Sequence, residues 1–312
     1  MTRLRRLAAP LAILALVAFF ALALPGTFLT ARNWLNISQQ ASMLLVVAAT
    51  MTIAMAGGDF DLSVGSMASL AGVAAAVLFV HGWPVWAGVA AALALGLVGG
   101  LVNGGLVAYA GLLPFVVTLG TLTSYSGLAF TAAGGKTIFG RDIPAAFGGF
   151  ARGGLSIGGA VVPNLTIVAA TVLALAWVAL ERRRFGRWLY AIGDNVEAAR
   201  LAGIPVRRMR LAAFACTGAG GAIAGLMYAS RVASANPTQG AGLMLPAIAA
   251  VFLGQTMTAD GTPRVLATLG GVIVLGVLDN GLTQLSVDSY VREVLVGAII
   301  IGAVWASRVA RG

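Results

Sequence analysis

Charged residues are scarce in this sequence. Of its 312 residues, 10% are charged and 59% are hydrophobic, whereas an average soluble domain carries roughly 25% charged residues. So few charges cannot solvate a globular surface, and lipid must therefore surround most of the molecule. The apolar runs are also longer than the ~10-residue alternating strands of an outer-membrane barrel. The composition predicts an all-α polytopic membrane protein.

Cysteine, histidine and lysine occur once each, as Cys216, His81 and Lys136. A single cysteine excludes a disulfide or a thiolate metal cluster within the chain. His81 stands in an expected loop beside Trp83 and Pro84, so we expect no histidine-based metal site. The net charge of +10 comes almost entirely from arginine. A mixed basic patch that reads phosphates is not indicated, and we expect no nucleic acid partner.

Apolar segments recur along the chain and predict about ten transmembrane helices. The first, from Leu7 to Leu24, follows three arginines. Ala21-Leu22-Ala23 resembles the cleavage site of a signal peptide, but the run is as long as a membrane span, and we favour an uncleaved helix. The other helices are expected at about 37–56, 63–80, 85–109, from Pro114 to 133, 164–180, 211–229, 242–253, up to 285, and 291–307.

The connections between these helices set the orientation. With the N-terminus inside, fourteen basic residues fall in cytoplasmic loops and six fall outside, as the positive-inside rule requires. Both termini are then cytoplasmic. Residues 134–163 are expected to be a long glycine-rich connection and residues 230–241 a polar loop. The segment 242–253 is short for a span.

Residues 56–66, Ala-Gly-Gly-Asp-Phe-Asp-Leu-Ser-Val-Gly-Ser, interrupt the apolar pattern. Gly57 and Gly58 end one helix and permit tight turns, and Asp61 with Ser63 can cap the next helix. Irregular backbone within a membrane must be buried by protein or line a water-filled cavity. Because an unpaired acid at mid-bilayer costs about 2.5–3.5 kcal/mol, Asp59 and Asp61 must be capped, hydrated or protonated. Asp61 is either a cap or a direct ligand contact.

Two resemblances to nucleotide or catalytic sites are rejected. Gly134-Gly135-Lys136-Thr137 ends like a phosphate-binding loop, but Phe130 occupies the position where that pattern needs glycine. Gly57-Gly58-Asp59 resembles an intramembrane protease motif, but Ala56 replaces its first glycine. We therefore expect no catalytic residue and no nucleotide bound by this chain.

The arginine-rich segment 181–210 contains a short helix with a signal at each end. Asp194 is expected as the N-cap and Glu197 as the capping-box acid. Gly203 supplies a left-handed C-terminal residue, and Pro205 forbids continuation. The face formed by Ala198, Ala199, Leu201 and Ala202 is small and apolar. It would lie on the bilayer surface or dock into a partner.

Glu197-Ala198-Ala199 followed by Gly203 resembles the EAA coupling loop of permease subunits in ATP-binding cassette (ABC) importers. Residues 57–66 resemble the G-G-x-D-L-S-V-G-S signature of ribose/xylose/rhamnose-type sugar permeases, a group that includes autoinducer-2 permeases. Asp61 matches the aspartate of that signature. Asp59 is an extra acid and the candidate for what is particular to this chain's substrate or gating. Similar motifs follow in order at 102–104, 114–121, 186–193 and 276–281.

The resemblance implies a single permease domain over residues 1–312, in the bacterial inner membrane, that imports a monosaccharide or similar polyol and is not an enzyme. It implies cytosolic ATP-binding subunits that use ATP and Mg, a second permease subunit in a homodimer or heterodimer, and an extracytoplasmic sugar-binding protein. The coupling residues would be Asp194, Asn195, Glu197, Ala198, Ala199, Arg200 and Gly203. The translocation path would include Gly57, Gly58, Asp59, Asp61, Ser63, Ser66, Asn103, Asp279 and Asn280.

An ion-gradient-driven secondary transporter is the alternative. It would use Asp59, Asp61 and Asp279 as coupling carboxylates, but it gives no reason for the capped helix near residue 197. For Asp279-Asn280 an interhelical hydrogen bond is favoured over a substrate contact.

Overall fold

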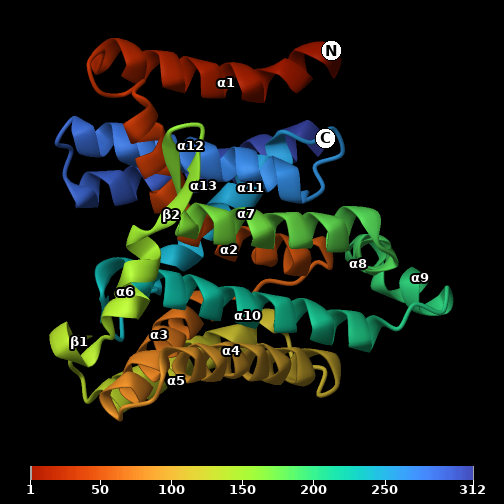
Figure 1. The fold of residues 1–312 in the computed structure, drawn as a ribbon. Helices are drawn as coiled ribbons and strands as arrows, with labels where there is room; N and C mark the ends of the chain where they lie inside the picture. The colour runs from red at the N-terminus through yellow and green to blue at the C-terminus, as the bar shows by residue number, and fades with distance from the viewer. Residues whose placement is uncertain (1, 312) are drawn as a thin grey trace.

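The computed structural model describes residues 2–311 and consists mostly of long helices (Figure 1). They are α1 (Thr2–Ala23), α2 (Ala31–Ala56), α3 (Val64–Val80), α4 (Val85–Ala108), α5 (Pro114–Ala133), α6 (Ala145–Arg152), α7 (Asn164–Trp177), α8 (Arg184–Asp194), α9 (Val196–Leu201), α10 (Val206–Val232), α11 (Met244–Thr256), α12 (Val265–Gln284) and α13 (Ser289–Arg311). The short strands β1 (Ile138–Phe139), β2 (Gly154–Ile157), β3 (Ala160–Pro163) and β4 (Ser234–Ala235) form two small sheets.

Among the described residues, six helices are long and apolar enough to cross a membrane: α2, α4, α5, α7 with its π-helical extension to Arg182, α10 and α12. Shorter apolar helices cover 13–23, 64–80 and 241–256. The all-α polytopic class is confirmed, whereas the count of ten spans stays a prediction. At 13 residues, α11 rises about 20 Å, less than the roughly 30 Å of a hydrocarbon core.

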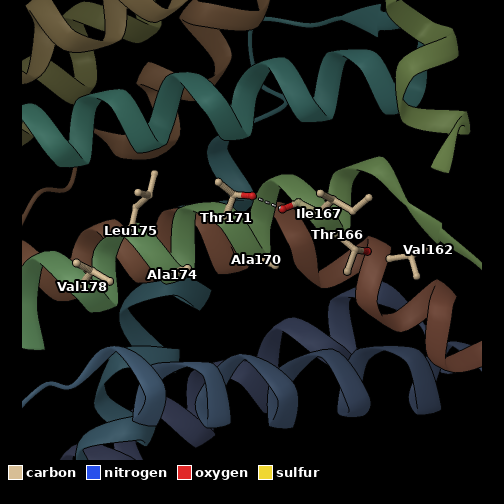
Figure 2. A pocket seen from close by; sticks show the side chains of 8 residues that line it. All are labelled: Val162, Thr166, Ile167, Ala170, Thr171, Ala174, Leu175 and Val178. Atoms are coloured by element: carbon tan, nitrogen blue, oxygen red, sulfur yellow. Dashed lines mark hydrogen bonds between the residues drawn. The ribbon is translucent and has the colours of Figure 1, made fainter. Parts of the chain in front are cut away.

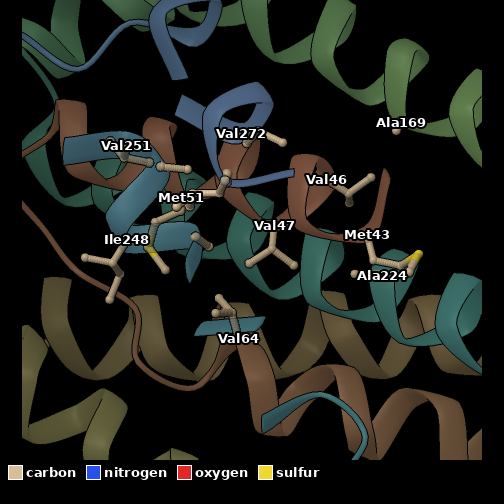
Figure 3. Packing of buried hydrophobic residues seen from close by; sticks show 14 of the residues in the cluster. Met43, Val46, Val47, Met51, Val64, Ala169, Ala224, Ile248, Val251 and Val272 are labelled. Atoms are coloured by element: carbon tan, nitrogen blue, oxygen red, sulfur yellow. The ribbon is translucent and has the colours of Figure 1, made fainter. Parts of the chain in front are cut away.

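The largest core cluster surrounds α2. Met43, Val46, Val47 and Met51 on this helix are buried and pack against apolar side chains from α7, α10, α11 and α12 (Figure 3). Ile248 of α11 closes the cluster on one side. The short helix α11 is therefore stabilised by packing against neighbouring helices inside the bundle.

Small residues set the contact between α4 and α10. Gly96, Gly100 and Gly104 face α10, and a Cβ added at Gly100 would lie 2.2 Å from the carbonyl oxygen of Phe214. Gly218 on α10 likewise has no room for a side chain, because an added Cβ would lie 2.2 Å from the carbonyl oxygen of Gly96. These three glycines of α4 are spaced four residues apart, a doubled small-xxx-small pattern, and form a helix-packing face.

The connection 134–163 is more ordered than the sequence suggested. It holds β1, α6 and the β2–β3 hairpin, and β1 pairs antiparallel with β4 from the predicted loop 230–241. Sequence patterning missed the β1–β4 pair because it has two residues per strand and joins Ile138 to Ala235.

Figure 1 shows β1 and α6 at one end of the bundle and α8 and α9 at the other. The labels for both termini lie on the side of α8 and α9. The cytoplasmic location of the termini remains a prediction.

Candidate functional site

The break between α2 and α3 is buried and hydrogen-bonded. Gly58 takes a left-handed φ of 81° as the chain leaves α2, a conformation that suits glycine. Asp61 is 0% exposed and accepts from the backbone amide of Ser63 (2.9 Å) and from its hydroxyl (2.6 Å). It also accepts from the hydroxyl of Thr217 on α10. Asp61 thus fixes the turn before α3 through the amide of Ser63, the N-cap residue, and α3 itself has no side-chain capping bond.

A second layer supports this carboxylate. Asn103 on α4 is buried and donates from Nδ2 to the Ser63 hydroxyl at 2.8 Å. The hydroxyl of Ser66 donates to the carbonyl oxygen of Ser63 at 2.9 Å. Of the predicted path residues, Asp61, Ser63, Ser66 and Asn103 therefore form one polar cluster with Thr217 between α3, α4 and α10. Sequence reasoning missed Thr217, a lone hydroxyl in an otherwise apolar stretch of α10.

Asp59 has a different partner. Its Oδ2 lies 3.1 Å from Nε of Arg210, and the side chains are 2% and 24% exposed respectively. Arg210 lies in the second turn of α10, at the end of the arginine-rich segment 181–210. This acid of the break is thus paired with a charge that the sequence places in the cytoplasmic arginine run.

Asp279 and Asn280 lie far from the break. Asn280 accepts from Nδ2 of Asn33 (3.1 Å) and from Nε2 of Gln284 (2.8 Å). Asn33 and Gly57 stand at opposite ends of α2, 24 positions and hence about 36 Å apart. The structure therefore divides the predicted path residues between the two ends of the bundle.

Asp279 is exposed by 57% and forms an ion pair of 2.6 Å with Arg292 of α13. Arg292 also donates to the hydroxyl of Thr283 at 2.7 Å. Together with the Asn33–Asn280 bond, this makes the Asp279-Asn280 pair a link between helices, as the sequence favoured.

The coupling segment consists of two helices, α8 and α9, and the predicted N-cap is wrong by one residue. Asp194 ends α8, whereas Asn195 caps α9 by accepting from the amide of Ala198 at 3.0 Å. Asn195 has the extended backbone (φ −158°) that an N-cap needs. Glu197 closes no capping box and instead pairs with Arg200 at 2.8 Å. Gly203 has the predicted left-handed φ, at 78°.

The small apolar face of α9 is split between the bundle and the surface. Ala199 is 3% exposed and packs with Ile192 and Val206. Leu201 is 88% exposed and Ala198 is also exposed. One part of the face thus fixes α9 to its neighbours while the other presents apolar surface outward.

Helix α8 is fixed to the bundle by its apolar side and by one hydroxyl. Leu189 and Ile192 are fully buried, and the hydroxyl of Tyr190 donates to the carbonyl oxygen of Pro263 at 2.9 Å. Burial, with the carboxylate of Glu181 adding to it, raises the pKa of Tyr190 above its ordinary value. The hydroxyl therefore keeps the proton that this hydrogen bond needs.

Two surface cavities lie elsewhere. One, of about 530 Å³, is an apolar groove along α7, lined by side chains from Val162 to Val178, whose Thr171 hydroxyl bonds back to Ile167 (Figure 2). The other, of about 710 Å³, lies between Tyr109 and the start of α10, beside Arg207 and Arg208. Neither cavity is lined by the residues of the break.

Comparison with known proteins places these features in a sequence family. A family model described as "Branched-chain amino acid transport system / permease component" matches residues 33–304. The ribose import permease protein RbsC of Escherichia coli K12 is 36% identical over 295 residues, covering 94% of this chain and 91% of its own. RbsC of Bacillus subtilis is 36% identical over 90% of this chain and 86% of its own. The xylose transport system permease protein XylH of E. coli K12 is 32% identical over 94% of this chain and 89% of its own.

Proposed function

The chain belongs to the branched-chain amino acid transport system / permease component family, and we propose that it is the transmembrane subunit of an ATP-driven importer for a monosaccharide or similar small polyol. It is a multi-pass protein of the inner membrane and a transport subunit rather than an enzyme. The observation that carries the proposal is the alignment over 94% of this chain with a ribose import permease.

Two substrate classes follow from the comparisons. The family description names branched-chain amino acids, whereas the relatives described above are named for ribose and xylose. The signature at residues 57–66 favours a sugar. A branched-chain amino acid is the second candidate, and a transport assay with both classes distinguishes them.

In the proposed importer, one permease domain works with partner chains. A cytosolic ATP-binding subunit docks on α9 and hydrolyses ATP with Mg, because this chain offers no phosphate-binding loop. An extracytoplasmic binding protein delivers the sugar at the opposite end, and a second permease subunit, identical or related, completes the path. The exposed Leu201 and Ala198 give α9 the apolar surface that a docked subunit would cover.

The polar cluster at the break holds the turn between α2 and α3 in one conformation. In the proposed importer, residues 57–66 and Asn103 shape the inner part of the path, and Asp279 with Asn280 fastens the helices at the other end. A secondary transporter would use Asp59, Asp61 and Asp279 as its coupling carboxylates. Asp279 neighbours Asn280, which bonds to Asn33 about 36 Å along α2 from Gly57 at the break, and Asp59 and Asp279 are each paired with an arginine. This separation and these ion pairs favour the ATP-driven class.

Reconstitution into liposomes tests this function. With the ATP-binding subunit inside and the binding protein outside, we expect uptake of radiolabelled ribose or xylose that requires ATP and both partners. Uptake by this chain alone under a proton gradient would contradict the proposal. Uptake of leucine in place of both sugars would keep the importer and change its substrate class.

Docking on α9 is tested with Leu201→Asp. Burying an exposed leucine side chain is worth about 2 kcal/mol, so we expect co-purification of the ATP-binding subunit to weaken about 30-fold. Leu155→Asp, the same substitution at an exposed leucine of β2 at the other end, is the matched control and should co-purify normally. Ala199 is unsuitable for this test because it is buried against α8 and α10. Equal recovery of the subunit by Leu201→Asp and wild type would exclude α9 as the dock.

A further inference from the structure

One buried charge pair joins the break to the helix that follows α9. We propose that Asp59 and Arg210 are positioning residues that carry movement of the coupling segment to the break between α2 and α3. The inference rests on the proposed function and assigns a role to the acid that the sugar-permease signature lacks.

The carboxylate of this pair is buried, whereas the arginine side chain is 24% exposed. Asp59 Oδ2 lies 3.1 Å from Arg210 Nε, and neither oxygen of Asp59 has a hydrogen-bond partner among the described residues. The arginine is therefore the neutralising group for this carboxylate. Because removing one member leaves a buried charge unpaired, the two side chains are constrained to move together.

Arg210 lies near the start of α10, the helix that follows α9 in the chain. The chain goes from Leu201 at the end of α9 through the left-handed Gly203 to Val206, where α10 begins. Arg210 lies four residues into α10, about 6 Å along its axis. A shift of α9 on binding or release of a partner therefore reaches Arg210 through one short connection.

Asp59 lies at the turn of the break between α2 and α3, so a movement of Arg210 acts directly on this turn. It follows Gly58, whose φ of 81° makes this the turn of the segment. Two residues later, Asp61 accepts from Thr217, which lies two turns beyond Arg210 on α10. The break is thus fastened to α10 at two points, one charged and one hydrogen-bonded.

The coupling segment also touches the break directly. A Cβ added at Gly193, near the end of α8, would lie 2.3 Å from the carbonyl oxygen of Ala56. This backbone contact prevents α8 from moving closer to the break. The Asp59–Arg210 pair keeps the break from separating from α10. The Gly193–Ala56 contact and the Asp59–Arg210 pair thus connect the coupling segment and the start of α10 to the break between α2 and α3 at two points.

The test is the ratio of sugar transported to ATP hydrolysed in the reconstituted importer, with radiolabelled ribose or xylose as the probe. Asp59→Asn and Arg210→Gln should each lower this ratio about tenfold, within the range of coupling between protein sites. The double variant should be no worse than either single one, because both remove the same contact. Arg210→Lys keeps the charge and should retain most of the ratio.

Asp260→Asn is the matched control. Asp260 pairs with Arg264 at 2.9 Å, but both side chains are about half exposed, so the loss should leave the ratio unchanged. Single variants that lower only the amount of folded complex, with a wild-type ratio of sugar to ATP, would overturn the inference while the proposed function stands. Absence of ATP-dependent uptake by the wild type would instead overturn both.

Discussion

Replacing Asp61 with alanine is expected to lower the free energy of unfolding by about 3–5 kcal/mol, since the change leaves two or more buried donors without an acceptor at about 1–3 kcal/mol each. The carboxylate accepts from the amide and the hydroxyl of Ser63 and from the hydroxyl of Thr217, and it is 0% exposed. Denaturation of the purified chain in mixed micelles with increasing SDS measures the change.

Asp61→Asn is the control that separates hydrogen bonding from charge. Its amide oxygen still accepts from Ser63, and its amide nitrogen can donate to the Thr217 oxygen, so we expect a loss of about 1 kcal/mol. An alanine variant within 1 kcal/mol of the wild type would mean that Asp61 does not hold the start of α3. In that case, sugar transport by the Asp61 variants would test whether Asp61 contacts the substrate directly.

Local signals in the sequence predicted the local features of the structure. The left-handed Gly203 and the start of α5 at Pro114 each depend on residues within one helical turn. The spacing of Gly96, Gly100 and Gly104 on α4 is likewise a local pattern of one helix face. Such features need no knowledge of which distant segment lies alongside.

The partners of the site could not be predicted, because they depend on the tertiary arrangement. Asp61 meets Thr217 across 156 positions, and Asn33 meets Asn280 across 247. The sequence showed Asp59 only as an acid within the membrane, whereas the structure pairs it with Arg210, close to the coupling segment. The error at Asp194 is smaller: Asp194 and Asn195 both suit an N-cap, and the turn between α8 and α9 selects the second.

Substituting leucine for Gly218 is expected to destabilise the chain by about 3 kcal/mol, at the upper end of the cost of overpacking. A Cβ at this position would lie 2.2 Å from the carbonyl oxygen of Gly96 and 2.7 Å from the backbone of Gly100. Neither backbone atom can rotate away as a side chain could, so α4 and α10 must separate. Separation also disturbs Thr217, the neighbouring residue that donates to Asp61.

Gly105→Leu on α4 is the matched control, because a Cβ there meets nothing within 4 Å. Leucine has a better helix propensity than glycine by roughly 0.5–1 kcal/mol, so this variant should be neutral or slightly more stable. The same SDS titration compares the two. If both variants unfolded at the same SDS concentration, the α4–α10 contact would not depend on close backbone approach. If only Gly218→Leu is weakened and its sugar uptake falls with it, the glycine face maintains the geometry that positions the break.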